Sequence, residues 1–593
     1  MNLSRQLTRC NHWLQHHESL YLSVLAVVIG ALAGYAALGF RLGIDRISQM
    51  WVGESSWSSV LATAPWYLFL MAPVCGGMVV GIINSYWLVP GEIKIIPAVM
   101  EALALRGGRI SMRRSSGETL SNMVALGSGA SMGREAPTVA LGAALSSLVG
   151  QWIHLNERQM RVMMGCGVAA GIAASFNAPI AGSLFALEVI LTDYTIGTFS
   201  PIVLAAVIST VITRAEVGNF PAFVVPHFAL SSYLQIPSYL VLGLICGLLA
   251  ALLIYLLPKV RDLFHHGIPH EILRPMVAGL LLGLLALLVP ELMSMGYGTV
   301  TALVNEGLSP HLLGFKVPLA VFLLLLLVLK VWTSLMCAGS GFGTGLIGPS
   351  VFLGSAAGAL FGLVAHQVAP GFTASYGSYA LIGAGAMMAA ALQAPASTIL
   401  MLFELSGEYQ IMMPLMTACV VATLVKLAFG KDSVFTEVLS SMGIDTQWGM
   451  ERAWLRSVPV SKIPWRVVPT VAADARLAEL KEEYVKSGKG CVQVVDDDGF
   501  LIGIVTFDDL KEWLLDSTLD QVVVASEVAN RQVKVVSESD SLLDAINVFD
   551  RENFEQMPVV AEDEPRKVLG MLARNAVFST YHKMIVKHGE SGH

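Results

Sequence analysis

The chain is poor in charged residues, and its cysteines are not arranged in pairs. Only 14% of its 593 residues are Asp, Glu, Lys or Arg, whereas 54% are hydrophobic. A soluble globular protein rarely combines these two fractions, so most of the chain is expected to lie in a membrane. The seven cysteines contain no CxxC pair, and most of them lie in apolar segments. Neither a disulfide framework nor a zinc site is therefore expected.

Several apolar runs are long enough, or nearly so, to cross a bilayer as helices, which takes about 20 residues. They cover residues 20–40, 238–257, 276–289 and 317–332. Basic residues gather in two connections, which hold Arg106, Arg109, Arg113 and Arg114 in the first and Arg158 and Arg161 in the second. Both connections are predicted to face the cytoplasm, because basic loops favour that side. The segment between them is then expected to enter the membrane.

The composition changes near residue 437, where apolar sequence gives way to a mixture of charged and apolar residues. We predict a membrane domain at 1–436, with an N-terminal flank at 1–19, and a linker at 437–456. Short β-branched runs then alternate with helical stretches, which is typical of a small α/β domain. The sequence around Asp474 recurs around Asp540, so this domain is divided into two units at 457–517 and 518–593.

The membrane domain carries two motifs, and each occurs twice in the same order. GSGASMGREAPTVALG at 127–142 matches GSGFGTGLIGPSVFLG at 339–354, including glycines and a proline. GVAAGIAASFNAPIAGSLFALE at 167–188 matches GAGAMMAAALQAPASTILMLFE at 383–404. Repeats with short apolar segments interrupted by Gly and Pro are typical of transporters whose broken helices meet within the bilayer. The half-repeats are predicted at about 20–215 and 236–436.

The first motif predicts a site for an anion. Pro137 and Pro349 mark helix starts, because proline has no N–H to leave unpaired in the first turn. The glycines before them let the backbone approach a ligand closely. A helix N-terminus offers unpaired N–H groups and about half a positive charge. Two such ends, one from each repeat, would together hold an anion.

These motifs resemble those of the CLC family of chloride channels and chloride/proton antiporters, of the bacterial type. GREAP (133–137) is similar to the family's GREGP signature and GLIGP (345–349) to its GxFxP signature, and the resemblance covers 20–436. It implies an all-α polytopic membrane protein with an inverted-topology repeat and broken helices. It also implies a homodimer in the cell (inner) membrane, with cytoplasmic termini and one anion pathway in each subunit.

The resemblance also assigns roles to single residues. Glu135 falls on the gating glutamate, whose carboxylate fills the outer anion site when ionised and leaves it when protonated. That role is chemically reasonable, because a carboxylate competes with chloride for the helix N-termini. An ion pair of Glu135 with Arg134 is the alternative, although adjacent residues point differently on a helix. The positions implied to bind the anion are Gly133, Arg134, Gly345, Leu346 and Ile347.

The C-terminal repeat resembles a pair of CBS domains, which are common in the same family. Its first unit ends in Gly503-Ile-Val-Thr506-Phe-Asp-Asp509, where the family binds the ribose and phosphates of an adenine nucleotide through Thr506 and Asp509. The second unit has Ala573 and Ala576 at those positions. Two interpretations stay open, namely one nucleotide site or a domain that stabilises a dimer without any ligand.

Three positions depart from the family pattern. The anion-binding GSGIP motif is replaced by IKIIP (93–97), so Lys94 either holds the anion or extends into water at the end of its helix. Phe435 replaces the tyrosine of the central anion site, and a phenyl ring donates no hydrogen bond. Val189 replaces the internal proton glutamate of the antiporters. Its neighbour Glu188 and the repeat-related Glu404 are expected to serve packing and hydrogen bonding between the halves.

Val189 favours a passive chloride channel gated by Glu135 and regulated by the CBS pair. The alternative is a chloride/proton antiporter with another internal proton route. A CBS-regulated cation channel is a remote alternative, because cation sites need clustered carboxylates or carbonyls, whereas the repeat supplies helix N-termini. A membrane sensor that transports nothing is another alternative, but it leaves the motif repeat unexplained. The expected partners are a small anion such as chloride, protons in the antiporter alternative, and the lipid bilayer. We expect no enzymatic activity, required cofactor, metal site or nucleic-acid partner.

Overall fold

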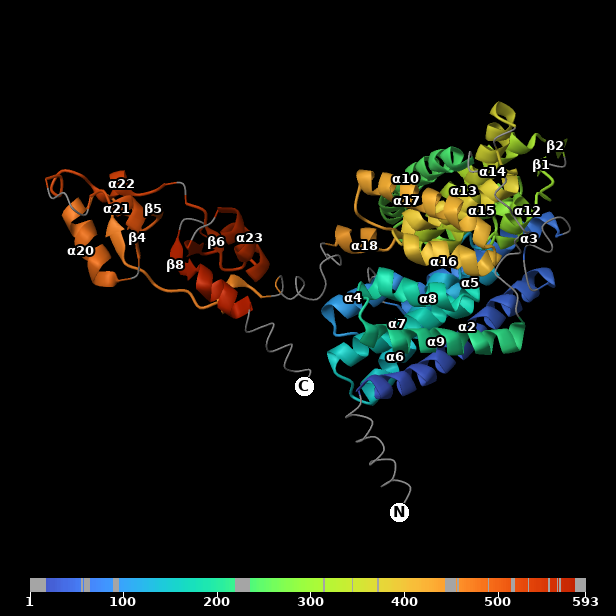
Figure 1. Cartoon of the computed structure of the whole chain (residues 1–593), viewed down its shortest axis with the longest axis horizontal. Coiled ribbons are helices and arrows are strands. Elements are labelled where there is room, and N and C mark those ends of the chain that lie inside the picture. Colours follow the sequence, from blue (N-terminus) through green and yellow to red (C-terminus); the bar gives the residue numbers. More distant parts are fainter. Residues whose placement is uncertain are drawn as a thin grey trace, which may run out of the picture. The chain divides into compact units, whose positions relative to one another are not determined.

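The computed structural model describes residues 18–54, 57, 64–88, 95–218, 235–312, 315–343, 345–370, 373–442, 455, 458–488, 490–513, 518–531, 533–552, 555–562, 564 and 567–581. The chain divides into two compact units, Met1–Thr446 and Gln447–His593. The first unit consists of helices and a short hairpin of β1 (His311–Leu312) and β2 (Phe315–Lys316), whereas the second unit is α/β (Figure 1).

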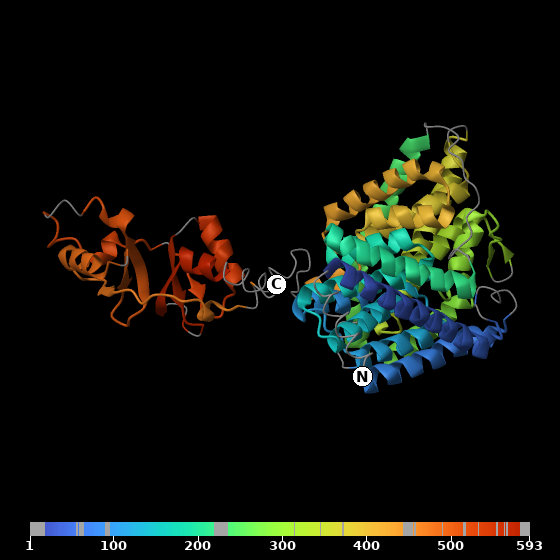
Figure 2. The same ribbon diagram turned by 60° about the horizontal axis from the view of Figure 1, so that its bottom comes forward.

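The helices of the first unit follow one another in two groups. The first group contains α2 (Glu18–Val52), α3 (Trp66–Tyr86), α4 (Ile95–Leu105), α5 (Met112–Gly127), α6 (Glu135–Trp152), α7 (Glu157–Phe176), α8 (Pro179–Phe185), the π-helix η2 (Ala186–Leu191) and α9 (Ile196–Val217). The second group contains α10 (Ile236–Gly267), α11 (Leu273–Ala286), η4 (Pro290–Leu292), α12 (Tyr297–Val304), α13 (Leu319–Ser340), α14 (Ile347–Val368), α15 (Tyr376–Leu392), α16 (Pro395–Ser406), η5 (Tyr409–Ile411), α17 (Met412–Phe429) and α18 (Thr436–Ser441). α8 packs on α16 where the groups meet, and α2 runs across α7 and α9 (Figure 2).

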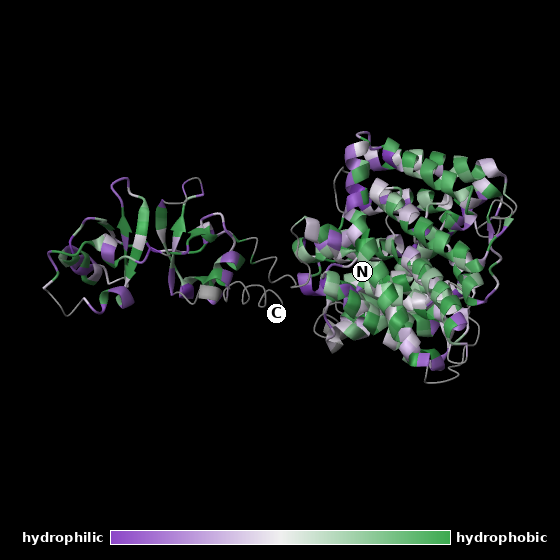
Figure 3. Ribbon diagram, turned by 90° about the horizontal axis from the view of Figure 1, so that it is seen from above, coloured by the Kyte–Doolittle hydropathy of each residue, from purple (hydrophilic) through white to green (hydrophobic). Residues whose placement is uncertain are grey.

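The first unit has the surface of a membrane protein. In the described part of the chain, seven helices are long and apolar enough to span a bilayer. Their outward side chains are also apolar: Leu244 is 47% exposed, Leu324 is 55% exposed and Leu424 is 60% exposed. Hydrophobic residues dominate these helices (Figure 3). Such a surface suits contact with lipid, so the prediction of a multi-pass membrane domain is confirmed.

The two sequence repeats are also repeats in structure. α7 ends at Asn177 and α15 ends at Gln393, and both residues are left-handed, with φ of 61° and 55°. The following helices α8 and α16 both begin with a proline. Gly142 touches the Gly167 carbonyl so closely that a side chain would clash, and Gly354 touches Gly383 in the same way. Each half thus packs two of its helices with the same backbone contact.

The second unit contains two similar sheets. One has β3 (Thr470–Ala472), β4 (Cys491–Val495) and β5 (Leu501–Thr506), and the other has β6 (Val536–Ser537), β7 (Gln556–Val560) and β8 (Val568–Ala573). In both sheets the first two strands are parallel, the last two are antiparallel, and the register shifts near the end of the middle strand. The helices include η6 (Val460–Lys462), α20 (Leu477–Ser487), α21 (Phe507–Leu510), α22 (Ala525–Val528) and α23 (Leu542–Glu552), and residues 574–581 are also helical.

The two sheets exchange short segments. Val460 and Ile463, which precede the first sheet in sequence, lie in the core around β7 and β8. Ala525, which belongs to the second sequence unit (518–593), lies in the core of the first sheet, around β4 and β5. The predicted α/β repeat is confirmed, and its two cores are built from interleaved pieces of chain.

Candidate functional site

Residues 128–134 form the tip of a hairpin between α5 and α6. α5 ends at Gly127 and α6 begins at Glu135. The other ends of these helices lie together, because Ser147 Oγ donates to the Gly108 carbonyl at 2.7 Å and accepts from the Ile110 N–H at 2.8 Å. The arginine-bearing connections therefore lie at one end of the hairpin, and the motif lies at the other end.

The two copies of the motif touch each other. The N–H of Gly133 donates to the carbonyl of Gly345 at 2.7 Å. A Cβ added to Gly133 would lie 2.7 Å from the Gly348 nitrogen, and one added to Gly345 would clash with the Gly133 carbonyl. Only glycine leaves room for this contact. It brings the first turns of α6 and α14, one from each repeat, to the same place.

Both helices begin slightly earlier than their prolines. α6 begins at Glu135 and α14 at Ile347, so Pro137 and Pro349 are third residues and lie in the first turn, as predicted. The residues before the helices have nearly the same φ, −85° at Arg134 and −91° at Leu346. The unpaired N–H groups of these first turns supply the positive end of each helix dipole.

The Glu135 side chain lies at this junction. It is fully buried, with 0% of its surface exposed. Its Oε1 accepts a hydrogen bond of 2.5 Å from the Tyr297 hydroxyl. Its Oε2 has no hydrogen-bond partner among the described residues, and a Cβ added to Gly348 would lie 3.6 Å from it. A buried carboxylate oxygen beside the start of α14 occupies a place suited to an anion.

The Arg134 side chain contacts the end of α7. Its guanidinium donates to the Ser175 carbonyl at 3.2 Å, and its Nε has no hydrogen-bond partner within the described ranges. No salt bridge joins Arg134 to Glu135 in the described part of the chain. Thr138, one turn into α6, also contacts Ser175, through hydroxyls 2.7 Å apart. Arg134 and Thr138 therefore fix the start of α6 against the end of α7.

Tyr297 is a site residue that the sequence did not reveal. It begins α12, after Gly296 with φ +77°, and a side chain on Gly296 would clash with the Phe352 ring of α14. Tyr297 lies between Gly296 and Gly298 in the sequence. These glycines are a weak signal for a helix start that packs closely against another part of the chain. Nothing in the spacing linked it to Glu135, because 162 residues separate them.

A buried lysine holds the segment before Tyr297. Lys330 is 0% exposed, and its ammonium donates to the carbonyls of Leu292 at 3.0 Å and Ser294 at 3.2 Å. The Ser294 N–H in turn donates to the Gly129 carbonyl at 2.9 Å. The loop that leads into α6 is therefore tied to the segment that presents Tyr297.

Two of the three departures from the motif pattern, Phe435 and Val189, lie in the part of the chain that the structure describes. Lys94 lies outside the described residues. Phe435 is buried and packs edge-on against Phe185 at a centroid distance of 6.4 Å, and within the described residues it makes no ring contact or hydrogen bond with Glu135. Val189 lies in η2, is 9% exposed and offers no group that can carry a proton.

Glu188 and Glu404 cap helices of the opposite half. Glu188 accepts from the N–H groups of Ala396 at 3.1 Å and Ser397 at 2.7 Å, at the start of α16. Glu404 accepts from the N–H groups of Ile180 at 3.0 Å and Ala181 at 2.8 Å, at the start of α8. The predicted role of this pair in hydrogen bonding between the halves is confirmed.

Thr506 and Asp509 contact each other in the second unit. The carboxylate of Asp509 accepts from the Thr506 N–H at 2.8 Å and from its hydroxyl at 2.7 Å. This arrangement caps α21 at the end of β5. Both side chains are half-buried, so part of each remains accessible to a ligand.

The chain is similar to known membrane transport proteins. The family model for the voltage gated chloride channel matches residues 75–427, and the CBS domain model matches 460–516 and 525–583. A ClcB-like protein of Ralstonia nicotianae is 34% identical over 71% of this chain and 97% of its own length. An H(+)/Cl(-) exchange transporter ClcA of Vibrio cholerae is 31% identical over 54% of this chain and 67% of its own. The crystal structure of a slow cyanobacterial Cl-/H+ antiporter has a TM-score of 0.63 at 22% identity and covers 71% of this chain and 97% of its own.

Proposed function

This chain belongs to the voltage gated chloride channel family and ends in a CBS pair, and on that premise we propose that it transports chloride across a membrane through a pathway within each subunit. The observation that carries the proposal is the Glu135 carboxylate at the contact of the two motif copies. Chloride in the same place would face the first turns of α6 and α14, whose N–H groups and dipoles favour an anion.

Glu135 is the gate of this pathway. When it is ionised, its carboxylate fills the anion site, and the hydrogen bond from Tyr297 holds it there. Protonation removes the charge that competes with chloride, so the side chain leaves and an anion takes its place. The oxygen of Glu135 that lies beside Gly348 supports this exchange, because an anion that replaces it would face the same first turn of α14.

Passive conduction is the first form of the proposal, and proton-coupled exchange is the second. Val189 supports conduction, because the residue at the usual internal proton position is apolar and buried. The exchange transporter of Vibrio cholerae supports the second form, because it is 31% identical to this chain. In that case another group must deliver protons to Glu135.

Chloride efflux from proteoliposomes, with the pH recorded at the same time, tests both forms. A chloride gradient should drive chloride out without moving protons uphill. Uphill proton movement driven by chloride would identify exchange instead of conduction. Absence of chloride efflux over the whole pH range would contradict chloride transport itself.

We place the protein in the cell (inner) membrane as a homodimer, with the arginine-bearing connections and both termini in the cytoplasm. The CBS pair regulates transport, with one adenine nucleotide bound near Thr506 and Asp509. A ribose hydroxyl in that place would replace the hydrogen bond that the Thr506 hydroxyl donates to the Asp509 carboxylate.

A further inference from the structure

Lys330 is a buried cation that has no carboxylate partner among the described residues. It lies on α13, which is long and apolar enough to span a bilayer, and 0% of its surface is exposed. No ion pair in the described part of the chain includes it. Burial of a charge without a counter-charge is costly, so an ionisable residue inside a membrane helix points to a function.

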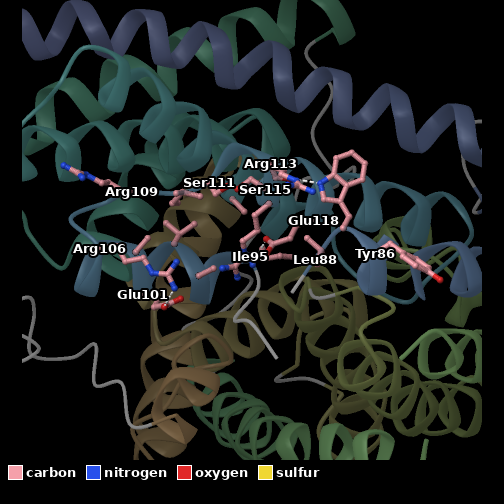
Figure 4. Close-up of a pocket in the computed structure, with 17 residues that line it drawn as sticks. Tyr86, Leu88, Ile95, Glu101, Arg106, Arg109, Ser111, Arg113, Ser115 and Glu118 are labelled. Carbon is pink, nitrogen blue, oxygen red and sulfur yellow. Dashed lines mark hydrogen bonds and ion pairs between the residues drawn. The ribbon is translucent and has the colours of Figure 1, made fainter. Parts of the chain in front are cut away.

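The basic side chains at the arginine-bearing end of the hairpin of α5 and α6 show the usual arrangement. Figure 4 shows Arg106 beside Glu101 at a cavity of about 460 Å³, and the two form an ion pair at 2.6 Å. Arg114 pairs with Glu118 at 3.1 Å. The other two arginines of the cavity are exposed. Lys330 is neither paired in this way nor exposed, so its charge is balanced by other groups.

The Lys330 ammonium bonds the backbone of the segment that leads into α12. It donates to the carbonyls of Leu292 at 3.0 Å and Ser294 at 3.2 Å. It also lies 4.6 Å from the centre of the Phe352 ring of α14, whose face attracts a cation. These contacts offset part of the cost of burial. They also fix the segment 292–296, which we call the Lys330 turn.

The Lys330 turn contains a residue in an unfavourable conformation. Ser294 has a φ of 59°, which a residue with a side chain rarely adopts. Such a conformation persists only where the surroundings fix it. Here the Ser294 carbonyl accepts from Lys330, and the Ser294 N–H donates to the Gly129 carbonyl at 2.9 Å. Both polar groups of this backbone unit are therefore fixed from outside the turn.

Tyr297 follows the Lys330 turn directly. Gly296 has a φ of 77°, and a Cβ added to it would lie 2.3 Å from the Phe352 ring. The same ring therefore lies against Lys330 and against the residue before Tyr297. The Tyr297 hydroxyl donates to Glu135 Oε1 at 2.5 Å. A shift of the turn would move this hydroxyl away from the carboxylate.

α13 also contacts the loop that leads into α6. Thr333, about one turn after Lys330, is fully buried, and its hydroxyl lies 3.3 Å from the Ser131 hydroxyl. Ser131 precedes Glu135 by four residues. Residues one turn apart lie on the same face of a helix. One face of α13 thus contacts both the loop before Glu135 and the turn before Tyr297.

We propose that Lys330 is a positioning residue of the gate, because it fixes the Lys330 turn and so keeps the Tyr297 hydroxyl on the Glu135 carboxylate. This inference rests on the proposed function, in which Glu135 closes the chloride pathway. With the ammonium in place, ionised Glu135 is held in the anion site. Without it, the turn relaxes from its left-handed conformation, Tyr297 shifts, and ionised Glu135 leaves the site more often.

Other charged or titratable groups lie near this network. In the described part of the chain they are Arg134 near Glu135 and Tyr297, Cys337 on the same helix as Lys330, and Glu291 of η4 with His311 near it. The arginine keeps its charge, and a buried thiol does not ionise near neutral pH. All four groups stay unchanged in the variants below, so differences between these variants report on Lys330, Tyr297 and Glu135.

The test measures chloride efflux from proteoliposomes that contain the full chain. Lys330→Met replaces the ammonium by an apolar group of similar length, and efflux at neutral pH should rise several-fold, as in Tyr297→Phe. At acidic pH the variant and wild type should transport alike, because Glu135 is then protonated in both. A merely structural role would instead predict a lower efflux at both pH values.

A double variant shows whether Lys330 acts through Tyr297. In a Tyr297→Phe background, Lys330→Met should leave the efflux rate unchanged, because the hydrogen bond that it weakens is already absent. Lys426→Met is the matched control, since Lys426 is also buried and its ammonium also donates to two carbonyls, those of Gly430 and Asp432. The factor by which Lys426→Met changes efflux should be the same in wild type and in Tyr297→Phe.

Two results would overturn the role of Lys330 and leave the proposed function in place. One is a folded Lys330→Met variant whose efflux at neutral pH does not exceed that of wild type. The other is a rise in the Tyr297→Phe background as large as the rise in wild type. Absence of chloride efflux from wild type would remove the proposed function, and this inference with it.

Lys330→Gln replaces Lys330→Met if that variant does not fold. Its side chain is shorter and ends in an amide, so it cannot hold both carbonyls of the Lys330 turn where the ammonium holds them. The same several-fold rise at neutral pH is expected, and it should again be absent in the Tyr297→Phe background. An efflux rate equal to that of wild type would contradict the positioning role.

Discussion

The Tyr297 hydroxyl donates a hydrogen bond to Oε1 of Glu135 at 2.5 Å, and it joins the first repeat to α12 of the second half. Tyr297→Phe removes this donor without changing the shape of the ring. Since a hydrogen bond to a charged group is worth roughly 1.5–3 kcal/mol, ionised Glu135 should leave its site more easily. We expect chloride efflux at neutral pH to rise about tenfold.

A second tyrosine provides the control for this change. Tyr379 is buried in α15, and its hydroxyl lies 2.6 Å from Ser238 Oγ; no hydrogen bond joins it to Glu135 in the described part of the chain. Tyr379→Phe should leave the efflux rate as in wild type. Equal rates for Tyr297→Phe and wild type would show that Tyr297 does not hold the gate.

The contact between Gly133 and Gly345 predicts intolerance of any side chain. Gly345→Ala places a methyl group against the Gly133 carbonyl, so the starts of α6 and α14 must separate. Such overpacking costs about 1–3 kcal/mol, and we expect a lower melting temperature and loss of chloride efflux. Gly39→Ala on α2 is the control, since a Cβ there meets no atom within 4 Å. Normal transport by Gly345→Ala would contradict the assignment of this junction.

The caps made by Glu188 and Glu404 predict an effect on stability and none on gating. Each carboxylate accepts two N–H groups at the start of a helix in the other half. Glu188→Gln and Glu404→Gln should each lower the free energy of unfolding by about 1–3 kcal/mol, measured by thermal unfolding in detergent. The pH dependence of chloride efflux should stay as in wild type. A shifted pH profile in Glu188→Gln would place that carboxylate in the proton route instead.

The pair of Thr506 and Asp509 predicts where an adenine nucleotide binds. Isothermal titration of the full chain with ATP should give one site per subunit, and Thr506→Ala should weaken binding about tenfold by removing the hydroxyl. Thr580→Ala is the matched control, because that hydroxyl donates to the carbonyl of Ala576 in its own helix. Absence of ATP binding to wild type would favour a CBS pair that serves only dimer stability.

The part of the site that rests on local backbone chemistry could be predicted from the sequence. Glycine before a helix and proline in its first turn each have a conformational cause, so the two motif copies predicted the starts of α6 and α14. The role of Glu135 came from the resemblance of GREAP to the family signature. Glu188 and Glu404 were likewise found because they occupy equivalent places in a repeat. These signals lie within a few residues of each other, or recur at a constant offset.

Contacts made by tertiary packing left no such signal. Tyr297 reaches Glu135 across 162 residues, and no periodicity joins them. Arg114 and Glu118 read in sequence as an ordinary pair one helical turn apart, whereas the structure adds the bond from Ile95 N–H to Glu118. Glu118, Ser121 and Asn122 lie in a mostly polar stretch of the sequence, and only the packing of α5 shows that they are buried. Long-range packing decides which polar groups end up buried together.

The most direct test of the central claim compares the chloride efflux of Glu135→Gln with that of wild type at neutral and at acidic pH. The amide cannot ionise, so the variant should be about tenfold faster than wild type at neutral pH. The two rates should approach each other as the pH falls, because wild-type Glu135 becomes protonated. Equal rates of variant and wild type at both pH values would contradict the assignment of Glu135 as the gate.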